Sequence, residues 1–278
     1  MIIDAHHHLW YFNKEDYGWM DDTMDVLRRD YLPGELAEQL SNAGVGGTVV
    51  VQARQKIKET KWLLELADKN AFIKGVVGWV DLRSDRLNDQ LDEFASHPKL
   101  VGVRHVIHDE PDDHFMLRPE FLSGIEKLSD YKLTYDLLLF PRHLTHAAEL
   151  AKRFPGQKFV LDHISKPHIK AASMQPWEDD IAALGAYSNV WCKISGMVTE
   201  ADLHHWKYDD FVPYMDVVVQ AFGSDRLMLG SDWPVCRLAG EYHEVMNIPG
   251  RYFESFDSDK RMKIFKNNAI EFYELDIN

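Results

Sequence analysis

The sequence predicts an α/β protein with a single (β/α)8 fold, the TIM barrel, and three observations carry this prediction. The chain has 278 residues, close to the roughly 250 residues typical of such a barrel. Short runs rich in β-branched and apolar residues alternate along the chain with stretches of helical periodicity. Polar side chains gather where these runs end, and barrels of this kind carry their chemistry at the C-terminal ends of the strands.

Eight segments are expected to form parallel strands, because each is a short apolar run bounded by turn-forming residues. They are residues 2–8, 48–54, 73–81, 100–107, 133–139, 158–163, 190–195 and 226–232. An open, doubly wound sheet is the main alternative, but its glycine-rich GxGxxG fingerprint is missing after the first run. The sequence therefore favours a closed barrel.

Between the strands, apolar residues recur every three or four positions, which indicates helices that cover the outside of the barrel. The expected helices are residues 32–43, 59–69, 87–97, 119–129, 142–154, 177–187 and 208–222, and the terminal stretch 257–275 is expected to supply the eighth. Because no linker rich in Pro, Gly or Ser divides the chain, residues 1–278 are expected to form one domain.

Composition and charge argue against several classes of protein. Hydrophobic residues make up 45% of the chain, yet no run approaches the roughly 18 apolar residues that span a bilayer. The formal charge of −14 disfavours binding to the phosphates of nucleic acid. The start of the chain lacks the pattern of a signal peptide, and Cys192 and Cys236 lie far apart. We therefore expect a cytoplasmic protein that binds neither a membrane nor nucleic acid.

The first predicted strand ends in two histidines, His6 and His8, on alternate residues. Because side chains of a strand alternate between its faces, Asp4, His6 and His8 are expected to project together into the barrel mouth, with His7 pointing away. Two neutral imidazoles placed in this way can share one metal ion or one polarised oxygen. A polar strand end with hydrogen-bonded histidines is the structural alternative.

Two later strand ends carry the other candidates for the chemistry. His163 stands at the end of the sixth predicted strand, and Asp232 at the end of the eighth. Pro234 stops strand pairing there and leaves the Asp232 carboxylate facing the pocket, where it can ligate a metal or take a proton from water. A hydrogen-bonded structural histidine and a turn-forming aspartate are the alternatives.

Alternation points further polar side chains toward the same mouth, as candidates for binding a ligand. They are Gln52, Arg104 or its neighbour His105, and Lys193 with Ser195. Cationic groups in this position can polarise a carbonyl and hold a carboxylate. Each of these side chains could instead form an ion pair inside the barrel, for instance Lys193 with Asp136 or Asp162.

The order of these residues resembles the amidohydrolase superfamily, which has HxH on the first strand, histidine on a middle strand and aspartate on the last. Four longer stretches are similar to its amidohydrolase-2 branch, which contains sugar lactonases: DAHHHLW at 4–10, LDHISKP at 161–167, KISGMVTE at 193–200 and GSDWP at 230–234. With GVRH at 102–105 and the closing Asn268-Ala269, the resemblance covers essentially the whole chain.

The resemblance implies a hydrolase that opens a sugar-derived lactone, such as L-fucono- or L-rhamnono-lactone, to the hydroxy acid. His6, His8, His163 and Asp232 would bind one divalent metal ion, with Zn²⁺ the expected ion, although some lactonases of this branch need no metal. The fourth predicted strand offers no lysine for carbamylation, which argues against a binuclear centre. Asp232 would deprotonate the attacking water, and Trp233 could stack on the sugar ring.

Two alternatives to a lactonase stay open on the sequence. A metal-dependent decarboxylase of an aromatic or unsaturated acid uses the same residues on the same barrel within this superfamily. A non-catalytic sugar- or metal-binding barrel is the other, although its pocket would hold a base and a metal site without a use for them. Release of carbon dioxide, release of acid, or binding without turnover distinguishes the three.

Overall fold

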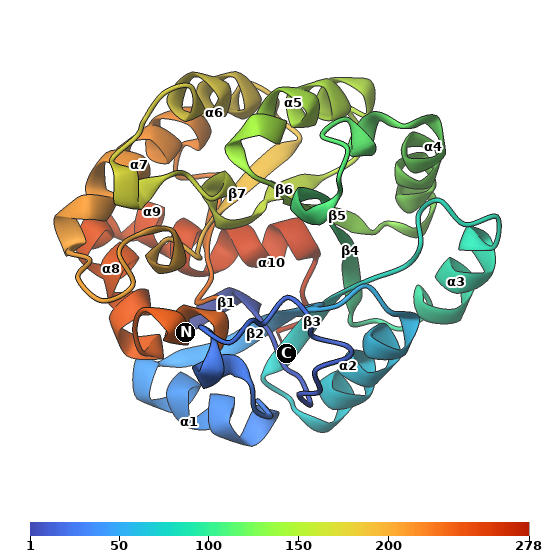
Figure 1. Ribbon diagram of the computed structural model, residues 1–278, viewed down its shortest axis with the longest axis horizontal. Coiled ribbons are helices and arrows are strands. Elements are labelled where there is room, and N and C mark those ends of the chain that lie inside the picture. Colours follow the sequence, from blue (N-terminus) through green and yellow to red (C-terminus); the bar gives the residue numbers. More distant parts are fainter. Residues whose placement is uncertain (278) are drawn as a thin grey trace.

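Eight parallel strands pair in sequence order and form a nearly closed barrel surrounded by helices (Figure 1). The computed structural model describes residues 1–277. The strands are β1 (Ile2–His7), β2 (Val45–Val51), β3 (Ile73–Gly78), β4 (Leu100–Val106), β5 (Thr134–Leu138), β6 (Phe159–Leu161), β7 (Val190–Ile194) and β8 (Leu227–Leu229). Each of the eight predicted strands is present, and the fold is the predicted (β/α)8 barrel.

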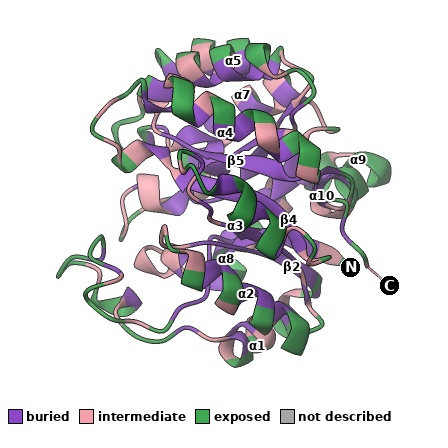
Figure 2. Ribbon diagram, turned by 90° about the vertical axis from the view of Figure 1, so that its right-hand side faces the viewer, coloured by how far each residue is buried: buried purple, intermediate pink, exposed green. Residues whose placement is uncertain are grey.

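One main helix follows each strand and covers the outside of the barrel. These helices are α1 (Pro33–Ala43), α2 (Ile57–Lys69), α3 (Leu87–Phe94), α4 (Pro119–Leu128), α5 (Leu144–Arg153), α6 (Trp177–Gly185), α7 (Tyr208–Phe222) and α8 (Tyr242–Tyr252). Apolar residues at helical spacing, such as Leu36 and Leu40 of α1, form their buried faces. Figure 2 shows the result: buried residues line the strands and the inner faces of the helices, and exposed residues lie on the outer faces.

The eighth outer helix is α8, so the prediction that residues 257–275 would supply it is wrong. Pro249 and Gly250 lie inside α8, and both residues are poor helix formers that hide its pattern in the sequence. The terminal stretch instead forms α9 (Ser258–Met262), a π-helical turn and α10 (Asn268–Tyr273). α10 runs across the middle of the barrel in Figure 1, and Phe272 and Tyr273 pack with Ile3 and Ala5 of β1. The C-terminal helix therefore closes the end of the barrel at which the strands begin.

The backbone of β1 departs from simple alternation. Its register against β2 shifts between Asp4 and His7. As a result the Asp4 carboxylate turns away from the barrel mouth and accepts hydrogen bonds from Ser231 Oγ (2.6 Å) and from the Tyr242 hydroxyl of α8 (3.0 Å). The expectation that Asp4 shares the mouth with His6 and His8 is therefore wrong, because an irregularity in a strand changes which side chains share a face.

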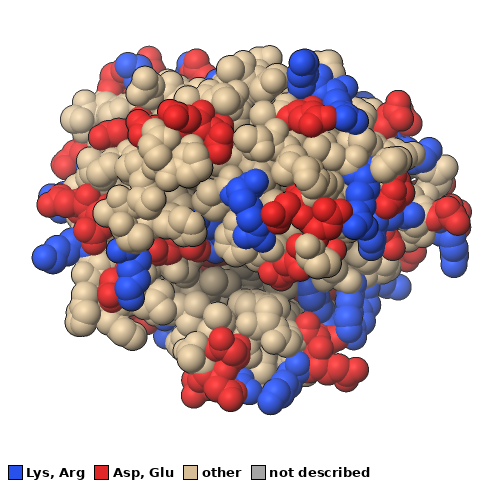
Figure 3. Space-filling view, turned by 45° about the horizontal axis from the view of Figure 1, so that its top comes forward, with Lys and Arg blue, Asp and Glu red and all other residues tan. Residues whose placement is uncertain are grey.

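The surface is charged and mixed. Acidic and basic side chains are interspersed over the face drawn in Figure 3, without one large region of either sign. Within the part of the chain that the structure describes, no helix has both the length and the apolar character that a membrane crossing requires.

Candidate active site

The site lies at the seam where the last strand of the barrel meets the first. The backbone N–H of Asp232 donates to the His6 carbonyl (2.8 Å), and that of His8 donates to the Trp233 carbonyl (2.6 Å). Gly230 makes this approach possible, because a Cβ atom at this position would lie 2.5 Å from His6 Cβ. Strand β8 stops at Leu229, and Asp232 has a positive φ of 56°, so its side chain leaves the strand direction. This turn is why the strand is shorter than the sequence predicts.

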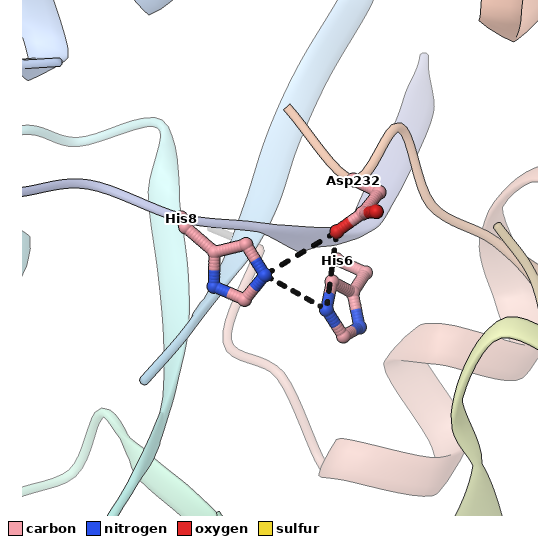
Figure 4. A group of neighbouring side chains, drawn as sticks. All are labelled: His6, His8 and Asp232. Atoms are coloured by element: carbon pink, nitrogen blue, oxygen red, sulfur yellow. Dashed lines mark hydrogen bonds and ion pairs between the residues drawn. The ribbon is translucent and has the colours of Figure 1, made fainter. Parts of the chain in front are cut away.

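Figure 4 shows His6, His8 and Asp232 converging on one point. The two Nε2 atoms of His6 and His8 lie 3.2 Å apart. Asp232 Oδ1 lies 3.3 Å from His8 Nε2 and 3.8 Å from His6 Nε2. His163 approaches from β6, with its Nε2 also 3.8 Å from Asp232 Oδ1. The structure thus brings together the four residues that the sequence singles out for chemistry.

Hydrogen bonds on the far side of each ring turn the three Nε2 atoms toward this point. His8 Nδ1 lies 2.7 Å from the Val51 carbonyl oxygen, which can only accept, so His8 carries a proton on Nδ1. His6 Nδ1 faces Asp162 Oδ1 and Lys193 Nζ, each at 3.2 Å, and His163 Nδ1 faces Ser195 Oγ at 2.9 Å. Partners of this kind fix the orientation of histidines that bind metals.

His163 stands in a strained turn that begins two residues after β6. Residues His163, Ile164, Ser165 and Lys166 all have positive φ, between 47° and 62°. Such left-handed backbone costs roughly 1–2 kcal/mol for each residue other than glycine. The turn is held because the Ile164 side chain is buried and the Trp177 indole N–H donates to the Ile164 carbonyl at 2.8 Å. Strain of this kind persists where the surrounding structure imposes it, often at functional sites.

Burial and neighbouring charges decide the protonation of the site. Burial lowers the pKa of His6 well below its usual value, against a partial opposing effect of Asp162. Burial likewise lowers the pKa of His163 to about 3. Burial alone would raise the pKa of Asp232, but the surrounding imidazoles, led by His163, outweigh it and lower this pKa. Near neutral pH the site therefore combines neutral His6 and His163 rings with an ionised carboxylate.

This set of atoms fits a single divalent metal ion. One ligand atom from each of His6, His8 and Asp232 lies within 4.8 Å of the others. The 3.2 Å between the two Nε2 atoms is close to the roughly 3.3 Å expected for two imidazole ligands on tetrahedral zinc. Asp232 Oδ1 is buried, and the described residues offer it no hydrogen-bond donor in good geometry. A cation would satisfy the carboxylate oxygen and could bind the two Nε2 atoms.

A layer of buried ion pairs lies beneath the histidines. Asp162 forms two ion pairs: its Oδ2 lies 2.9 Å from Arg104 Nη1, and its Oδ1 lies 3.0 Å from Lys193 Nζ. Lys193 also pairs with Asp136 at 2.5 Å, and the Tyr273 hydroxyl of α10 donates to the same Asp136 carboxylate at 2.8 Å. Lys193 therefore has the barrel-interior ion pairs that the sequence left open. Because Asp162 already pairs with the cations of Arg104 and Lys193, it is a poor ligand for a second metal ion.

Above the histidines lies a cavity of about 470 Å³, lined by His8, Arg104, His163 and Asp232 among other residues. Of the two candidates on β4, Arg104 and not His105 lines the cavity. Its Nη1 lies 3.3 Å from His6 Nε2, beside the point where the histidines converge. The guanidinium is therefore positioned to donate a hydrogen bond to a bound oxygen.

The other substrate-binding candidates lie outside this cavity. Gln52 is fully buried and donates to the Arg104 carbonyl at 3.3 Å. His105 stacks on the Phe115 ring and contacts Glu110 Oε1 at 2.6 Å. Trp233 is 1% exposed and packs edge-on against Tyr31. Gln52 and Trp233 support the cavity wall from behind, and His105 packs between the barrel and its outer layer.

The sequence did not indicate most of the cavity wall, because most of its residues lie on loops that follow the strands. Polar residues from the loops after β4, β6 and β7 form one part: His108, Asp109, Lys166, Thr199 and Glu200. Apolar residues form the rest: Trp19, Met24, Ala53, Val106, Leu138, Phe140, Leu203, Val235, Leu238. Among the polar residues, Lys166, Thr199 and Glu200 carried a signal, since they belong to the stretches LDHISKP and KISGMVTE.

Comparison with known proteins places this site in a family. The amidohydrolase family model matches residues 3–275. L-fucono-1,5-lactonases of Burkholderia ambifaria and Burkholderia multivorans are 36% and 37% identical to this chain, cover 99% and 98% of it, and are matched over 96% of their own length. A crystal structure of an amidohydrolase from Burkholderia multivorans with bound zinc superposes with a TM-score of 0.96, at 37% identity, over 99% of this chain and 100% of that one. The chain therefore belongs to the amidohydrolase family.

Proposed function

We propose that this protein hydrolyses the ester bond of a sugar-derived 1,5-lactone and releases the open hydroxy acid. The observation that carries the proposal is the convergence of a buried, ionised carboxylate, Asp232, with three imidazole Nε2 atoms beside a cavity that Asp232, His8 and His163 line. Lactone hydrolysis is also the activity named for the relatives that share more than a third of their residues with this chain.

In the proposed reaction Asp232 acts as general base. Its carboxylate takes a proton from a water molecule while the water oxygen attacks the lactone carbonyl, because its low pKa keeps it ionised. Arg104, whose guanidinium lines the cavity, donates a hydrogen bond to the carbonyl oxygen as negative charge develops there. The ester C–O bond then breaks, and Asp232 returns the proton to the ring oxygen that leaves as a hydroxyl group. One water is consumed and one hydroxy acid is formed.

We propose Zn²⁺ as the resident metal ion, held by His6, His8 and Asp232 with His163 beside them. The donor set of two imidazoles and one carboxylate is typical of zinc sites, and the similar Burkholderia multivorans structure contains zinc. When bound, the ion supplies Lewis-acid polarisation of the lactone carbonyl. The protein itself orients the rings through Val51, Asp162 and Ser195.

For the substrate we propose an aldonolactone of a deoxy sugar, with L-fucono-1,5-lactone as the leading candidate. The cavity has the mixed lining that such a molecule requires, since polar residues can bind ring hydroxyls while apolar residues contact the ring face and a methyl group. A role in carbohydrate metabolism follows from this substrate. We further propose a cytoplasmic location, supported by two buried free cysteines, Cys192 and Cys236.

A hydrolysis screen tests this function. Purified protein is given L-fucono-, L-rhamnono- and other aldono-1,4- and 1,5-lactones, and acid release is followed with a pH indicator, with and without a chelator. We expect acid release from the L-fucono series at a rate far above the spontaneous one. The same samples are assayed for carbon dioxide from aromatic and unsaturated acids. Carbon dioxide release without lactone opening would show that the protein is a decarboxylase and not a lactonase. Tight lactone binding without turnover would show that it is a binding protein.

A further inference from the structure

The polar wall of the cavity contains an ion pair that the reaction itself does not use. Lys166, on the turn after β6, pairs with Glu200 Oε1, at the end of the short helical turn Val198–Glu200 after β7. Both side chains line the cavity, and each is 18% exposed. Charged groups that line the cavity and remain partly exposed are available to a ligand.

A backbone hydrogen bond connects Lys166 to His163 of the candidate active site. Lys166 is the last residue of the left-handed turn that begins at His163, and its N–H donates to the His163 carbonyl at 2.8 Å. The two residues thus stand one turn apart, and both side chains reach the same cavity. The strained turn therefore sets the distance between the imidazole beside Asp232 and the ammonium group on the cavity wall.

The pair has unused hydrogen-bonding capacity. An ammonium group has three N–H donors, and among the described residues Glu200 is the hydrogen-bond partner that the structure gives Lys166 Nζ. Glu200 likewise offers a second carboxylate oxygen. Asp109, on the loop after β4, lies in the field of the pair: its hydrogen bond with His108 and, more weakly, the charge of Lys166 lower its pKa. This wall therefore presents both donors and acceptors.

We propose that Lys166 and Glu200 together recognise two neighbouring hydroxyl groups of the substrate, and so select polyhydroxylated lactones over unsubstituted ones. Lys166 donates to one hydroxyl oxygen, and Glu200 accepts from the neighbouring hydroxyl. A carboxylate beside an ammonium group matches a vicinal diol because each hydroxyl both donates and accepts. The inference rests on the proposed lactonase function and extends it to the residues that determine specificity.

The test compares ligands with and without hydroxyl groups in the variants Lys166→Met and Glu200→Gln. The substrates are L-fucono-1,5-lactone and δ-valerolactone, the same six-membered lactone ring without the hydroxyl and methyl groups. We expect kcat/KM for the sugar lactone to fall by about tenfold to a hundredfold, the loss of one charge-assisted hydrogen bond, mainly through KM. The value for δ-valerolactone stays within about twofold of the wild type. Calorimetry measures the affinity for L-fuconate and 5-hydroxypentanoate, the two product acids, and so gives the same comparison without turnover.

Lys170→Met is the matched control. Lys170 pairs with Asp202 at 3.2 Å between the same two loops, but it is 68% exposed and lies outside the cavity. In this variant, kcat/KM for both lactones and the binding of both product acids should match the wild type. If the Lys166 and Glu200 variants lost kcat/KM and affinity equally for hydroxylated and unsubstituted ligands, the pair would only hold the two loops together. That result would overturn the inference. A wild type that opens neither lactone would refute the proposed function instead.

Discussion

The N–H of Asp232 donates to the carbonyl oxygen of His6 over 2.8 Å, and this hydrogen bond joins the end of the last strand to the first. The proposed base and one proposed metal ligand are thus fixed to each other through the backbone as well as through their side chains. The Asp4 carboxylate reinforces the seam from outside, since it accepts both the N–H (2.9 Å) and the hydroxyl (2.6 Å) of Ser231. The hydrogen bonds that close the barrel therefore also position the residues of the site.

Replacement of Asp232 by Asn should abolish turnover while the fold is kept. Asn has the same shape and tolerates the positive φ of 56° found here, but it cannot accept a proton. We expect kcat to fall by about a hundredfold to ten-thousandfold, the contribution of a general base. Steady-state kinetics and a thermal melt of the same preparation measure both effects. Near-normal activity in this variant would remove Asp232 from the role of base.

Metal content should respond to the loss of one histidine. We expect the wild type to bind about one divalent ion per chain, because Arg104 and Lys193 already neutralise Asp162 beside the site. His8→Ala should bind zinc far more weakly, since it removes one of three convergent ligand atoms. Elemental analysis after dialysis against a defined zinc buffer measures both proteins. His108→Ala, which alters the cavity wall without changing the convergent set, serves as control. Two ions per wild-type chain would contradict the prediction.

Gly230→Ala should disrupt the seam. Its new Cβ atom would lie 2.5 Å from His6 Cβ, and both positions are held by backbone, so overpacking should cost about 1–3 kcal/mol and lower activity. Gly34→Ala is the comparison, because a Cβ atom there meets nothing within 4 Å and the residue lies in helix α1. That variant should be up to about 1 kcal/mol more stable. Urea unfolding curves measure the stability of both variants. A Gly230→Ala variant as stable as the wild type would show that the seam can shift without cost.

Buried Glu59 should make stability depend on pH. Burial raises the pKa of this carboxyl from 4.5 to about 7, while it accepts the N–H groups of Ala53 and Arg54 at 3.1 and 3.0 Å. Between these two pH values the folded protein keeps a proton that the unfolded chain has lost. The contribution of Glu59 to stability therefore falls as pH rises through this window, by about 3 kcal/mol.

Glu59→Gln isolates this effect, because Gln is uncharged and can still accept one of the two N–H groups. We expect the free energy of unfolding of the variant, relative to the wild type, to increase between pH 5 and pH 8. Urea unfolding at a series of pH values gives this difference. A difference that stays constant with pH would mean that Glu59 keeps an ordinary pKa in the folded protein.

Tyr273→Phe tests the coupling of the C-terminal helix to the layer of buried charges. Its hydroxyl donates to Asp136, the carboxylate that also pairs with Lys193. Removing the donor leaves a buried carboxylate with one partner fewer, at a cost of about 1–3 kcal/mol. The free energy of unfolding measures the loss. Unchanged stability would indicate that water or Lys193 replaces the hydroxyl without cost.

Much of the fold could be predicted from local sequence patterns. The alternation of β-rich and helical segments gave all eight strands, because periodicity reflects which side chains must be buried on each element. It did not reveal α8, since Pro249 and Gly250 lower the helical propensity of that stretch. Residues at strand ends were found because the carboxyl ends of parallel strands meet in one place.

The sequence by itself determined the eight-stranded barrel and drew attention to His6, His8, His163 and Asp232. Tertiary structure alone decided which side chains reach the cavity. Asp4 turned outward through a register shift within β1, and Arg104 rather than His105 faces inward. Lys166 and Glu200 meet across two loops. The physical reason is that periodicity is set by neighbours in the chain, whereas the face that a strand turns inward and the meeting of distant loops depend on how the whole barrel closes.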